Sequence, residues 1–330
     1  MHKDEVPKLM EWIGLYWKKG HVLSYDRKLF DFQHRYADGY NFYVARNRET
    51  HNFDAILGFI STAQYDTSLG DERDVWLALW KVNELEAKEK ILGLRLMQLL
   101  MKKEHPNSIG VIGISEVARN IYSLLSFACG KMSQYYYVNK KLKKYHLISG
   151  DFARQATIET DAAELRKIER IESHSNLIHK YHPKKTIAYL VNRYASHPSY
   201  KYFFYGVFVH DMIRSILVMR KSEYESASCL RIVDCLGELL PVSLMKEWDR
   251  LLENENAEFI DFLNFGIDET IFLKMGFMKR DDSVIIPNYF EPFEKRNVEL
   301  FFAYKSTRPY VFFKGDGDQD RSSETSRGNR

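Results

Sequence analysis

A basic turn with one glycine is the feature of this sequence that most clearly predicts chemistry. The segment KEKILGLR places cations at Lys88, Lys90 and Arg95. Gly93 lies among them, at the start of a stretch, 94–103, that predicts a helix. Backbone N–H groups at a helix N-terminus bind anions, and glycine lets the backbone approach them closely. Cations at that end are unfavourable by about 0.3–1 kcal/mol unless an anion lies nearby, so the turn predicts a diphosphate site.

Two apolar runs flank this turn and predict the strands that would hold it. Residues 75–82 read VWLALWKV and have the length and bulk of a buried strand. Residues 109–114 read IGVIGI and predict the next strand. The order of strand, basic turn, helix and strand predicts a site for a phosphorylated cofactor.

This order resembles the GNAT superfamily of acyltransferases, which bind acyl-coenzyme A. The family motif after its fourth strand is Arg or Gln, two residues, Gly, one residue, and then Gly or Ala. The matching positions here are Lys90, Gly93 and Arg95, of which the first and the last depart from the pattern.

The helix that follows the second run resembles the family as well. It carries Asn120 and Tyr122 and ends near Gly130, where a glycine suits a left-handed C-cap. In the family this helix holds the cofactor or protonates the departing thiolate. The resemblance therefore implies a cofactor contact for Asn120 and an acid role for Tyr122. A tyrosine that only packs in the core or lies at the surface is the alternative.

The resemblance implies one cofactor site, built from the first strand, the basic turn and the helices. We expect the strand to splay from its neighbour, so that its backbone binds the pantetheine arm and an N–H group around Val82 binds the developing oxyanion. Trp76 and Trp80 share one face by strand alternation, so core packing is the alternative for them. The residues expected to bind acyl-coenzyme A are Trp80, Lys81, Val82, Lys88, Lys90, Leu92, Gly93, Leu94, Arg95 and Asn120.

Transfer to an amine also predicts a base, because an acceptor that arrives as ammonium must lose a proton before it attacks a thioester. His34 accepts a proton near neutral pH, and Glu84 and Glu116 are its rivals. A lone histidine is more often structural, and in this family water chains often replace a single base.

Composition bounds the class of protein. The chain has 330 residues, enough for two domains, and its 45% hydrophobic residues predict a large core. Lys and Arg number 48 against 45 Asp and Glu, a balance that argues against nucleic acid as the main partner. The three cysteines lack metal spacing and His174, His179 and His182 are expected at the surface, so no metal is predicted. Without a leader pattern or an apolar run near the ~18 residues of a membrane span, we expect a soluble cytoplasmic protein.

The order of elements predicts an α/β protein with two GNAT-like domains, each a mixed central sheet flanked by helices and related by duplication. The tetrapeptides GISE and GIDE begin at Gly113 and Gly266, 153 residues apart. The run 75–82 shifted by that distance falls on another apolar run, 228–235. Helices are expected at 8–20 and 26–36, and further strands at 41–47, 54–61, 135–138, 145–148 and 259–265. The expected units are 1–150 for a domain that binds acyl-coenzyme A, 151–181 for a helical linker, 182–315 for a degenerate domain that shapes the acceptor site, and 316–330 for a tail.

The second half departs from the first where a diphosphate would need cations. Glu238 follows its apolar run in place of the basic turn and would repel a diphosphate, so we expect the cofactor only in the first half. The C-terminal FKGDGDQDR resembles the ending of tandem-GNAT proteins of bacterial surface-polysaccharide synthesis. This implies N-acylation of a nucleotide-linked amino-deoxysugar, expected to be dTDP-linked, for O-antigen or capsule. The residues expected to bind that substrate are Gln33, Tyr289, Lys314, Asp316, Asp318 and Arg321.

Two other functions stay open. A Fem-like aminoacyl transferase that uses aminoacyl-tRNA shares the tandem fold, but it should show a more basic groove. A non-catalytic scaffold with two degenerate GNAT domains would account for the departures from the motif. A test of cofactor binding distinguishes this scaffold from both enzymes. A homodimeric state is likewise open.

Overall fold

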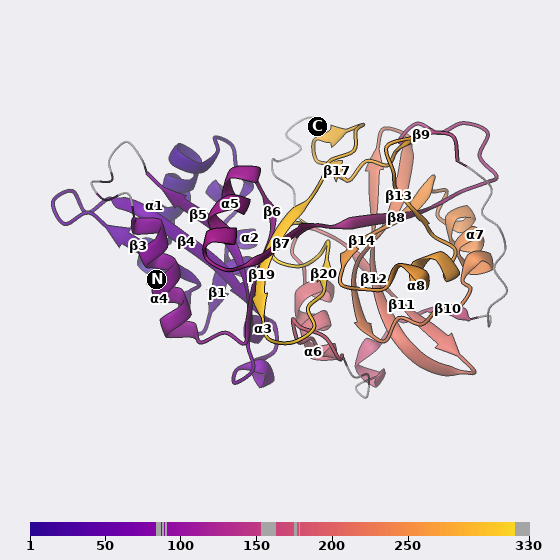
Figure 1. Cartoon of the computed structure of the whole chain (residues 1–330), viewed down its shortest axis with the longest axis horizontal. Helices are drawn as coiled ribbons and strands as arrows, with labels where there is room; N and C mark the ends of the chain where they lie inside the picture. The colour runs from indigo at the N-terminus through magenta and orange to yellow at the C-terminus, as the bar shows by residue number, and fades with distance from the viewer. Residues whose placement is uncertain are drawn as a thin grey trace.

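Two large mixed sheets, each flanked by helices, organise the computed structural model (Figure 1). The structure describes residues 1–83, 87, 89, 91–152, 163–174, 177 and 179–320. Most of the first half of the chain lies on one side of the molecule and most of the second half on the other (Figure 1). The mixed α/β class predicted from the sequence is confirmed.

The first sheet is built from strands whose apolar residues are buried on both faces. β4 (Phe53–Ser61) is buried along its whole length, as expected of a central strand between packed layers. The strands predicted at 75–82 and 109–114 are confirmed as β5 (Asp74–Val82) and β6 (Ser108–Ile114). In spatial order the strands are β3 (Phe42–Arg46), β4, β5, β6, β19 (Phe301–Ser306) and β7 (Ala128–Lys131).

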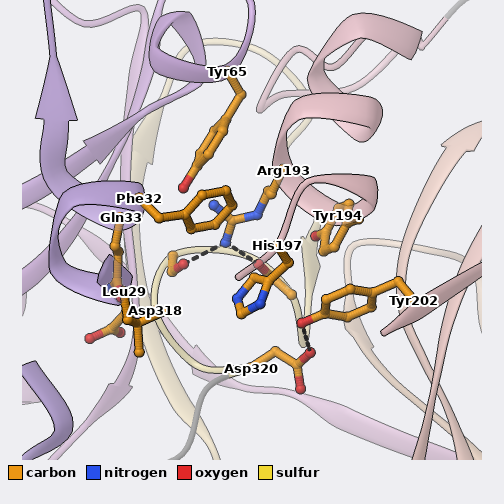
Figure 2. A pocket seen from close by; sticks show the side chains of 12 residues that line it. Leu29, Phe32, Gln33, Tyr65, Arg193, Tyr194, His197, Tyr202, Asp318 and Asp320 are labelled. Atoms are coloured by element: carbon orange, nitrogen blue, oxygen red, sulfur yellow. Dashed lines mark hydrogen bonds between the residues drawn. The ribbon is translucent and has the colours of Figure 1, made fainter. Parts of the chain in front are cut away.

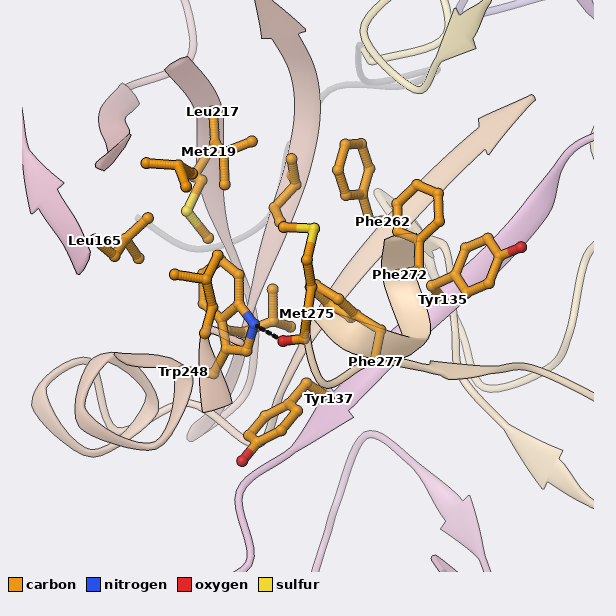
Figure 3. Packing of buried hydrophobic residues seen from close by; sticks show 14 of the residues in the cluster. Tyr135, Tyr137, Leu165, Leu217, Met219, Trp248, Phe262, Phe272, Met275 and Phe277 are labelled. Carbon is orange, nitrogen blue, oxygen red and sulfur yellow. Dashed lines mark hydrogen bonds between the residues drawn. The ribbon is translucent and has the colours of Figure 1, made fainter. Parts of the chain in front are cut away.

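The second sheet has the longer strands of the molecule. β13 (Ala227–Gly237) is buried throughout, and β14 (Phe259–Phe265) coincides with the strand predicted at 259–265. Beneath this sheet, Trp248 packs among apolar side chains and its Nε1 donates to Met275 O at 2.9 Å (Figure 3). In spatial order the strands are β10 (Glu164–Lys167), β11 (Tyr202–Val209), β12 (Met212–Tyr224), β13, β14, β8 (Ser133–Val138) and β15 (Met278–Lys279).

The two sheets exchange a strand. β8 comes from the first half of the chain but pairs with β14 of the second sheet, and β19 comes from the second half but pairs with β6 of the first sheet. Both sheets therefore show one order of pairing: an antiparallel pair, a parallel pair, and then an antiparallel pair with the exchanged strand. The residues 135–138, expected to close the first domain, lie instead in the second sheet.

The parallel strands of the first sheet separate after a short contact. β5 and β6 pair only from Asp74 with Ser108 to Trp76 with Gly110, although both strands continue. Beside the separation, two residues of β5, 78–79, lie opposite Gly58, since Leu57 pairs with Trp80 and Phe59 with Leu77. This is a β-bulge, which bends a strand and increases its twist. We call the gap between residues 77–82 and 111–114 the first wedge.

The second sheet repeats the wedge, but the chain fills it. β13 and β14 pair from Leu230 with Ile260 to Ile232 with Phe262 and then separate, and a bulge at Val233 accompanies the separation. The short β20 (Phe312–Phe313) pairs with the end of β14, and Gly315 N donates to Val233 O at 2.6 Å. We call residues 310–320, which enter this second wedge, the strap.

Helices α4 (Leu92–Glu104) and α5 (Glu116–Leu124) cover the face of the first sheet that points away from the second half. Leu96 and Leu100 of α4 and Tyr122 of α5 are buried against the strands. The remaining helices are α1 (Val6–Trp12), which continues as a π-helical turn Ile13–Trp17, α2 (Arg27–His34), α3 (Thr62–Tyr65), α6 (Ile187–Leu190), α7 (Met245–Asn254) and α8 (Glu269–Lys274). Within the described ranges, none of them has the length and apolarity that a bilayer crossing requires.

Four local predictions are wrong. α5 ends at Leu124, and Gly130 lies in β7 rather than at the C-cap of this helix. Residues 164–167, inside the linker expected to be helical, form the short strand β10. The strand expected at 145–148 does not form, and pairing is confined to the short β9 (Ser149–Gly150) with β16 (Val284–Ile285). Trp76 and Trp80 do not share a face, because the bulge between them reverses the alternation. Trp76 packs toward the second half of the chain, whereas Trp80 packs beside α4 and α5.

Candidate functional site

The start of α4 lies directly against the end of β5, at the mouth of the first wedge. Trp80 Nε1 donates to Gly93 O at 3.2 Å. A Cβ added at Gly93 would lie 3.0 Å from Trp80 Nε1 and 3.2 Å from Val82 Cγ2, so only glycine fits without a shift of these neighbours. The N-terminus of α4, where the first backbone N–H groups have no acceptor within the helix, therefore lies beside the end of β5.

The cations expected at this helix start are only partly described. Arg95 is exposed and pairs with Glu89, with 2.6 Å between Nη1 and Oε2. Leu92 is half-buried and Leu94 exposed, while Lys81 lies half-buried on β5. The predicted residues Glu84, Lys88 and Lys90 lie outside the described residues.

Tyr122 lies on the helix side of the first wedge. It is buried, and its ring packs 5.5 Å from the Trp80 ring and 5.2 Å from the Phe127 ring. Burial raises the pKa of Tyr122 well above its ordinary value, so the phenol keeps its proton at neutral pH, as an acid must. Asn120 is exposed on α5. The acid role of Tyr122 and the cofactor contact of Asn120 stay predictions.

His34, the predicted base, ends α2 inside the core. Its side chain is fully buried, its Nδ1 lies 3.2 Å from Phe59 O, and its ring packs against Phe30 and Phe42. A base must reach the proton that it removes, directly or through a water. This burial favours the structural alternative, and the catalytic role stays a prediction.

On the opposite side of the first sheet, the strap runs across the strands at the point where the wedge opens. Glycines mark the contacts: a side chain at Gly110 would overlap Phe312, and one at Gly113 would overlap Gln319. Gly317 lies against Trp76, where an added Cβ would be 3.5 Å from the Trp76 Cβ. The strap therefore touches both the open wedge of the first sheet and the filled wedge of the second.

Buried ion pairs and hydrogen bonds hold the strap in place. Lys185 Nζ lies 2.6 Å from Asp234 and 2.7 Å from Asp316, and all three side chains are fully buried. Burial raises the pKa of Asp316 to about 6, although the Lys185 ammonium acts in the opposite direction. Arg193 Nη2 donates to Gly315 O at 2.5 Å and to Gly317 O at 2.6 Å. Asp316, predicted to bind substrate, is thus placed inside the structure with Lys185.

A pocket lies between α2 and the strap, which we call the α2 pocket (Figure 2). Phe32 and Gln33 line it from the first half, Arg193 and His197 from the second, and Asp318 from the strap. About 30 Å³ is free in it, which is room for water only. The structure thus brings together two predicted substrate residues, Gln33 and Asp318.

His197 is a feature of this pocket that the sequence analysis missed. Its Nδ1 accepts from Ser199 N at 3.2 Å and from Tyr200 N at 3.0 Å, so a neutral ring carries its proton on Nε2. Burial lowers the pKa of His197 to about 4, which keeps the ring neutral at physiological pH. His197 therefore offers the pocket a hydrogen-bond donor rather than a base.

Arg193 was missed as well. Among the described residues no carboxylate lies within 4.0 Å of its buried guanidinium, which instead lies over aromatic rings such as Tyr65, 5.0 Å away. Its sequence context, AYLVNRYA, is one cation in an apolar helix, and that signal could have marked it. A buried cation whose partners are carbonyl oxygens and aromatic rings rather than a carboxylate is unusual, and such cations are typical of functional sites.

A second pocket lies on the other side of the strap, and we call it the β17 pocket after β17 (Tyr289–Phe290). Tyr289 and Lys314, both predicted to bind substrate, line it together. Arg220 and Arg231 line it from the second sheet. Arg321, the last predicted substrate residue, lies outside the described residues.

The three histidines expected at the surface are not exposed. His174 and His179 are half-buried, and both ring nitrogens of His179 are inaccessible to solvent. His182 is 3% exposed, and its Nδ1 lies 3.1 Å from both carboxylate oxygens of Asp74. Ser108 Oγ donates to the same carboxylate at 2.6 Å, so the group joins the start of the first wedge to the second half. Across the described ranges, no three His, Cys, Asp or Glu side chains gather as a metal site would require.

Comparisons with known proteins agree on the fold. No protein-family model matches the sequence, and no curated protein matches it. A GCN5-related N-acetyltransferase from Anabaena variabilis ATCC 29413 superposes with a TM-score of 0.54 at 11% identity, over 92% of this chain and 70% of that one. A conserved protein from Enterococcus faecalis V583, with N-acyl transfer as its suggested activity, gives 0.52 at 9% identity, over 91% and 70%. The chain therefore has the fold of the GCN5-related N-acetyltransferases.

Proposed function

We propose that this protein transfers an acyl group from acyl-coenzyme A to an amine, with the first wedge as the cofactor site. The observation that carries the proposal is the separation of β5 from β6 beside the N-terminus of α4. A separated strand offers backbone groups to an extended arm, and a helix N-terminus offers N–H groups to a diphosphate. The contact between Gly93 and Trp80 places these two features side by side.

The filled second wedge supports a single cofactor site. Phe312 and Phe313 pair with the end of β14, and Gly315 bonds to Val233, where an extended ligand arm would otherwise lie. In the second sheet the strap therefore occupies the wedge. This agrees with the absence of a basic turn after β13, where Glu238 stands instead.

Residues around the first wedge have roles that follow from their positions. When bound, acyl-coenzyme A supplies a thioester whose acyl carbon the acceptor amine attacks. The bulge at residues 78–79 interrupts the pairing of β5 with β4, and an N–H group of β5 up to Val82 would hold the oxyanion. Tyr122, protonated and packed on Trp80, would give a proton to the departing sulfur.

We further propose that the acceptor is a nucleotide-linked amino sugar, bound on the strap side of the first sheet, in synthesis of O-antigen or capsule. The C-terminal sequence resemblance supports this, and so do the two pockets that flank the strap. Both pockets are small as they stand, so the acceptor would have to widen them or bind across their openings.

Calorimetric titration with coenzyme A tests the cofactor site. Wild-type protein should bind one equivalent, and Gly93→Val should lose binding because its side chain would push α4 off Trp80 and Val82. Arg95→Glu should weaken binding by about tenfold, while Lys143→Glu, an exposed charge reversal outside this region, should not. Failure of the folded wild type to bind coenzyme A would leave the scaffolding reading or transfer from aminoacyl-tRNA.

A further inference from the structure

The β17 pocket contains a buried ammonium group that has no anionic partner among the described residues. Lys314 is 3% exposed. In the part of the chain that the structure describes, no acceptor atom hydrogen-bonds its Nζ and no carboxylate lies within 4.0 Å, and the group instead lies 4.9 Å from the Tyr289 ring centre. A buried charge in a protein is normally paired, so this one is available to a ligand.

The other charges around the pocket are already matched. Arg231 makes two bonds to Asp261, at 3.0 and 2.7 Å. Arg220 bonds to Asp320 at 2.9 Å, and Tyr200 donates to Glu291 at 2.8 Å. The carboxylates near Lys314 thus accept hydrogen bonds from other donors. The three N–H donors of Lys314 have no acceptor among the described residues.

The electrostatics agree with this description. Burial lowers the pKa of Lys314 to about 7, and the nearby Arg231 guanidinium acts in the same direction. Asp320 and Asp261 oppose the shift without cancelling it. A bound anion would supply the missing partner and raise the pKa again.

We propose that the β17 pocket binds an oxyanion group of the acceptor, a phosphate or a carboxylate, with Lys314 as its ammonium partner. The role of this subsite in binding the acceptor rests on the proposed acyl transfer. The binding of an anion to Lys314 can be tested independently of it. Gln319, which lines the same pocket, lies against Gly113 near the end of β6, so the subsite opens beside the first wedge. About 30 Å³ is free there, as in the α2 pocket, so the oxyanion group would bind at the opening of the pocket or widen it.

Sulfate is a suitable probe because its charge does not change between pH 6 and pH 8. We expect saturable binding of sodium sulfate by calorimetry at constant ionic strength, with coenzyme A present to occupy the α4 site. Lys314→Met should weaken binding by about tenfold or more, whereas the exposed Lys305→Met should not. Equal affinity in wild type and Lys314→Met, or no saturable binding, would overturn the proposal.

The pH dependence separates Lys314 from the fixed charges. Arg220 and Arg231 keep their charge, so a site formed by them alone would bind sulfate equally at pH 6 and pH 8. With Lys314 as partner, affinity should fall by about tenfold over that range, and the fall should vanish in Lys314→Arg. Methyl phosphate and acetate, titrated in the same way, then distinguish a phosphate from a carboxylate as the natural group. The protein could bind these anions without binding coenzyme A, or bind coenzyme A without binding these anions. A failure of this proposal can therefore be told apart from a failure of the proposed function.

Discussion

Lys185 is a buried cation that pairs with two buried carboxylates. Its ammonium joins Asp234 of β13 to Asp316 of the strap, and Tyr194 donates to the other oxygen of Asp234 at 2.7 Å. Two carboxylates in the interior are tolerated only while a cation lies between them. Lys185 therefore neutralises Asp316 of the strap, while Arg220 pairs with Asp320 farther along it.

Lys185→Met should destabilise the protein strongly, because it leaves both carboxylates buried without their cation. We expect a loss of about 3–5 kcal/mol in the free energy of unfolding, measured by urea denaturation. Lys184→Met is the matched control, since Lys184 pairs with Glu72 near the surface and should cost at most about 1 kcal/mol. A similar small effect for both variants would contradict the assignment.

His197 should make the protein sensitive to mild acid. Its folded-state pKa of about 4 lies below the ordinary value of 6.5, so the unfolded chain takes up the proton first. Stability is therefore full above the unfolded pKa and falls as pH decreases toward 4. Between pH 7 and pH 5 the wild type should lose about 1–2 kcal/mol more than His197→Asn, whose side-chain oxygen can still accept from the backbone. Parallel curves for the two proteins would show that His197 titrates normally.

At the scale of elements, the local sequence pattern predicted where strands form. It did not predict which face of the sheet each side chain occupies. The runs 75–82 and 259–265 are apolar enough to be strands in any context, and both form. Gly93 was predicted at a helix start with a close backbone approach, and it lies in the first turn of α4 against Trp80 and Val82, while its anion contact stays a prediction. The bulge that separates Trp80 from Trp76 was not predictable, because it depends on how β5 pairs with β4.

The pockets were beyond sequence reasoning for a related reason. Gln33 and Asp318 are far apart in the chain, and they meet only because the strap returns from the second wedge to the first sheet. Arg193 and His197 do not belong to a recognisable motif. They line a pocket only because the strap lies beside them. A charged C-terminal segment reads as solvent-exposed until its partner Lys185 is known.

The strap should be an essential element rather than a loose tail. A side chain at Gly315 would overlap the Tyr194 hydroxyl and lie 2.8 Å from Val233 O. Gly315→Val should therefore cost about 2–3 kcal/mol and expose residues 310–320 to limited proteolysis. Gly20→Asn, at a left-handed position with open space around it, is the control. Unchanged protease resistance in Gly315→Val would mean that the strap can seat in another way.

At the scale of the whole molecule, the exchanged strands decide how the two halves relate. Without β19, β6 would present an open edge beside β7, and without β8, β14 would do the same. The sequence does suggest the repeat, through GISE and GIDE, but strand exchange is a pairing between distant segments that leaves no local signal. The boundaries drawn at 150 and 182 divide the chain, whereas β8 and β19 join its two sheets across them.

This interlock predicts that the full chain unfolds in one cooperative transition. Separate domains would give separate transitions, but here the loss of either sheet removes a strand from the other. Trp248 reports on the second half, where it packs with Met275 (Figure 3), and Trp248→Phe leaves emission from the tryptophans of the first half. Urea curves from the wild type and from the Trp248→Phe protein should each show one transition that coincides with its own circular dichroism. A first-half signal that persists after the second sheet has melted would show that the halves are independent, and the exchanged strands would then add little to stability.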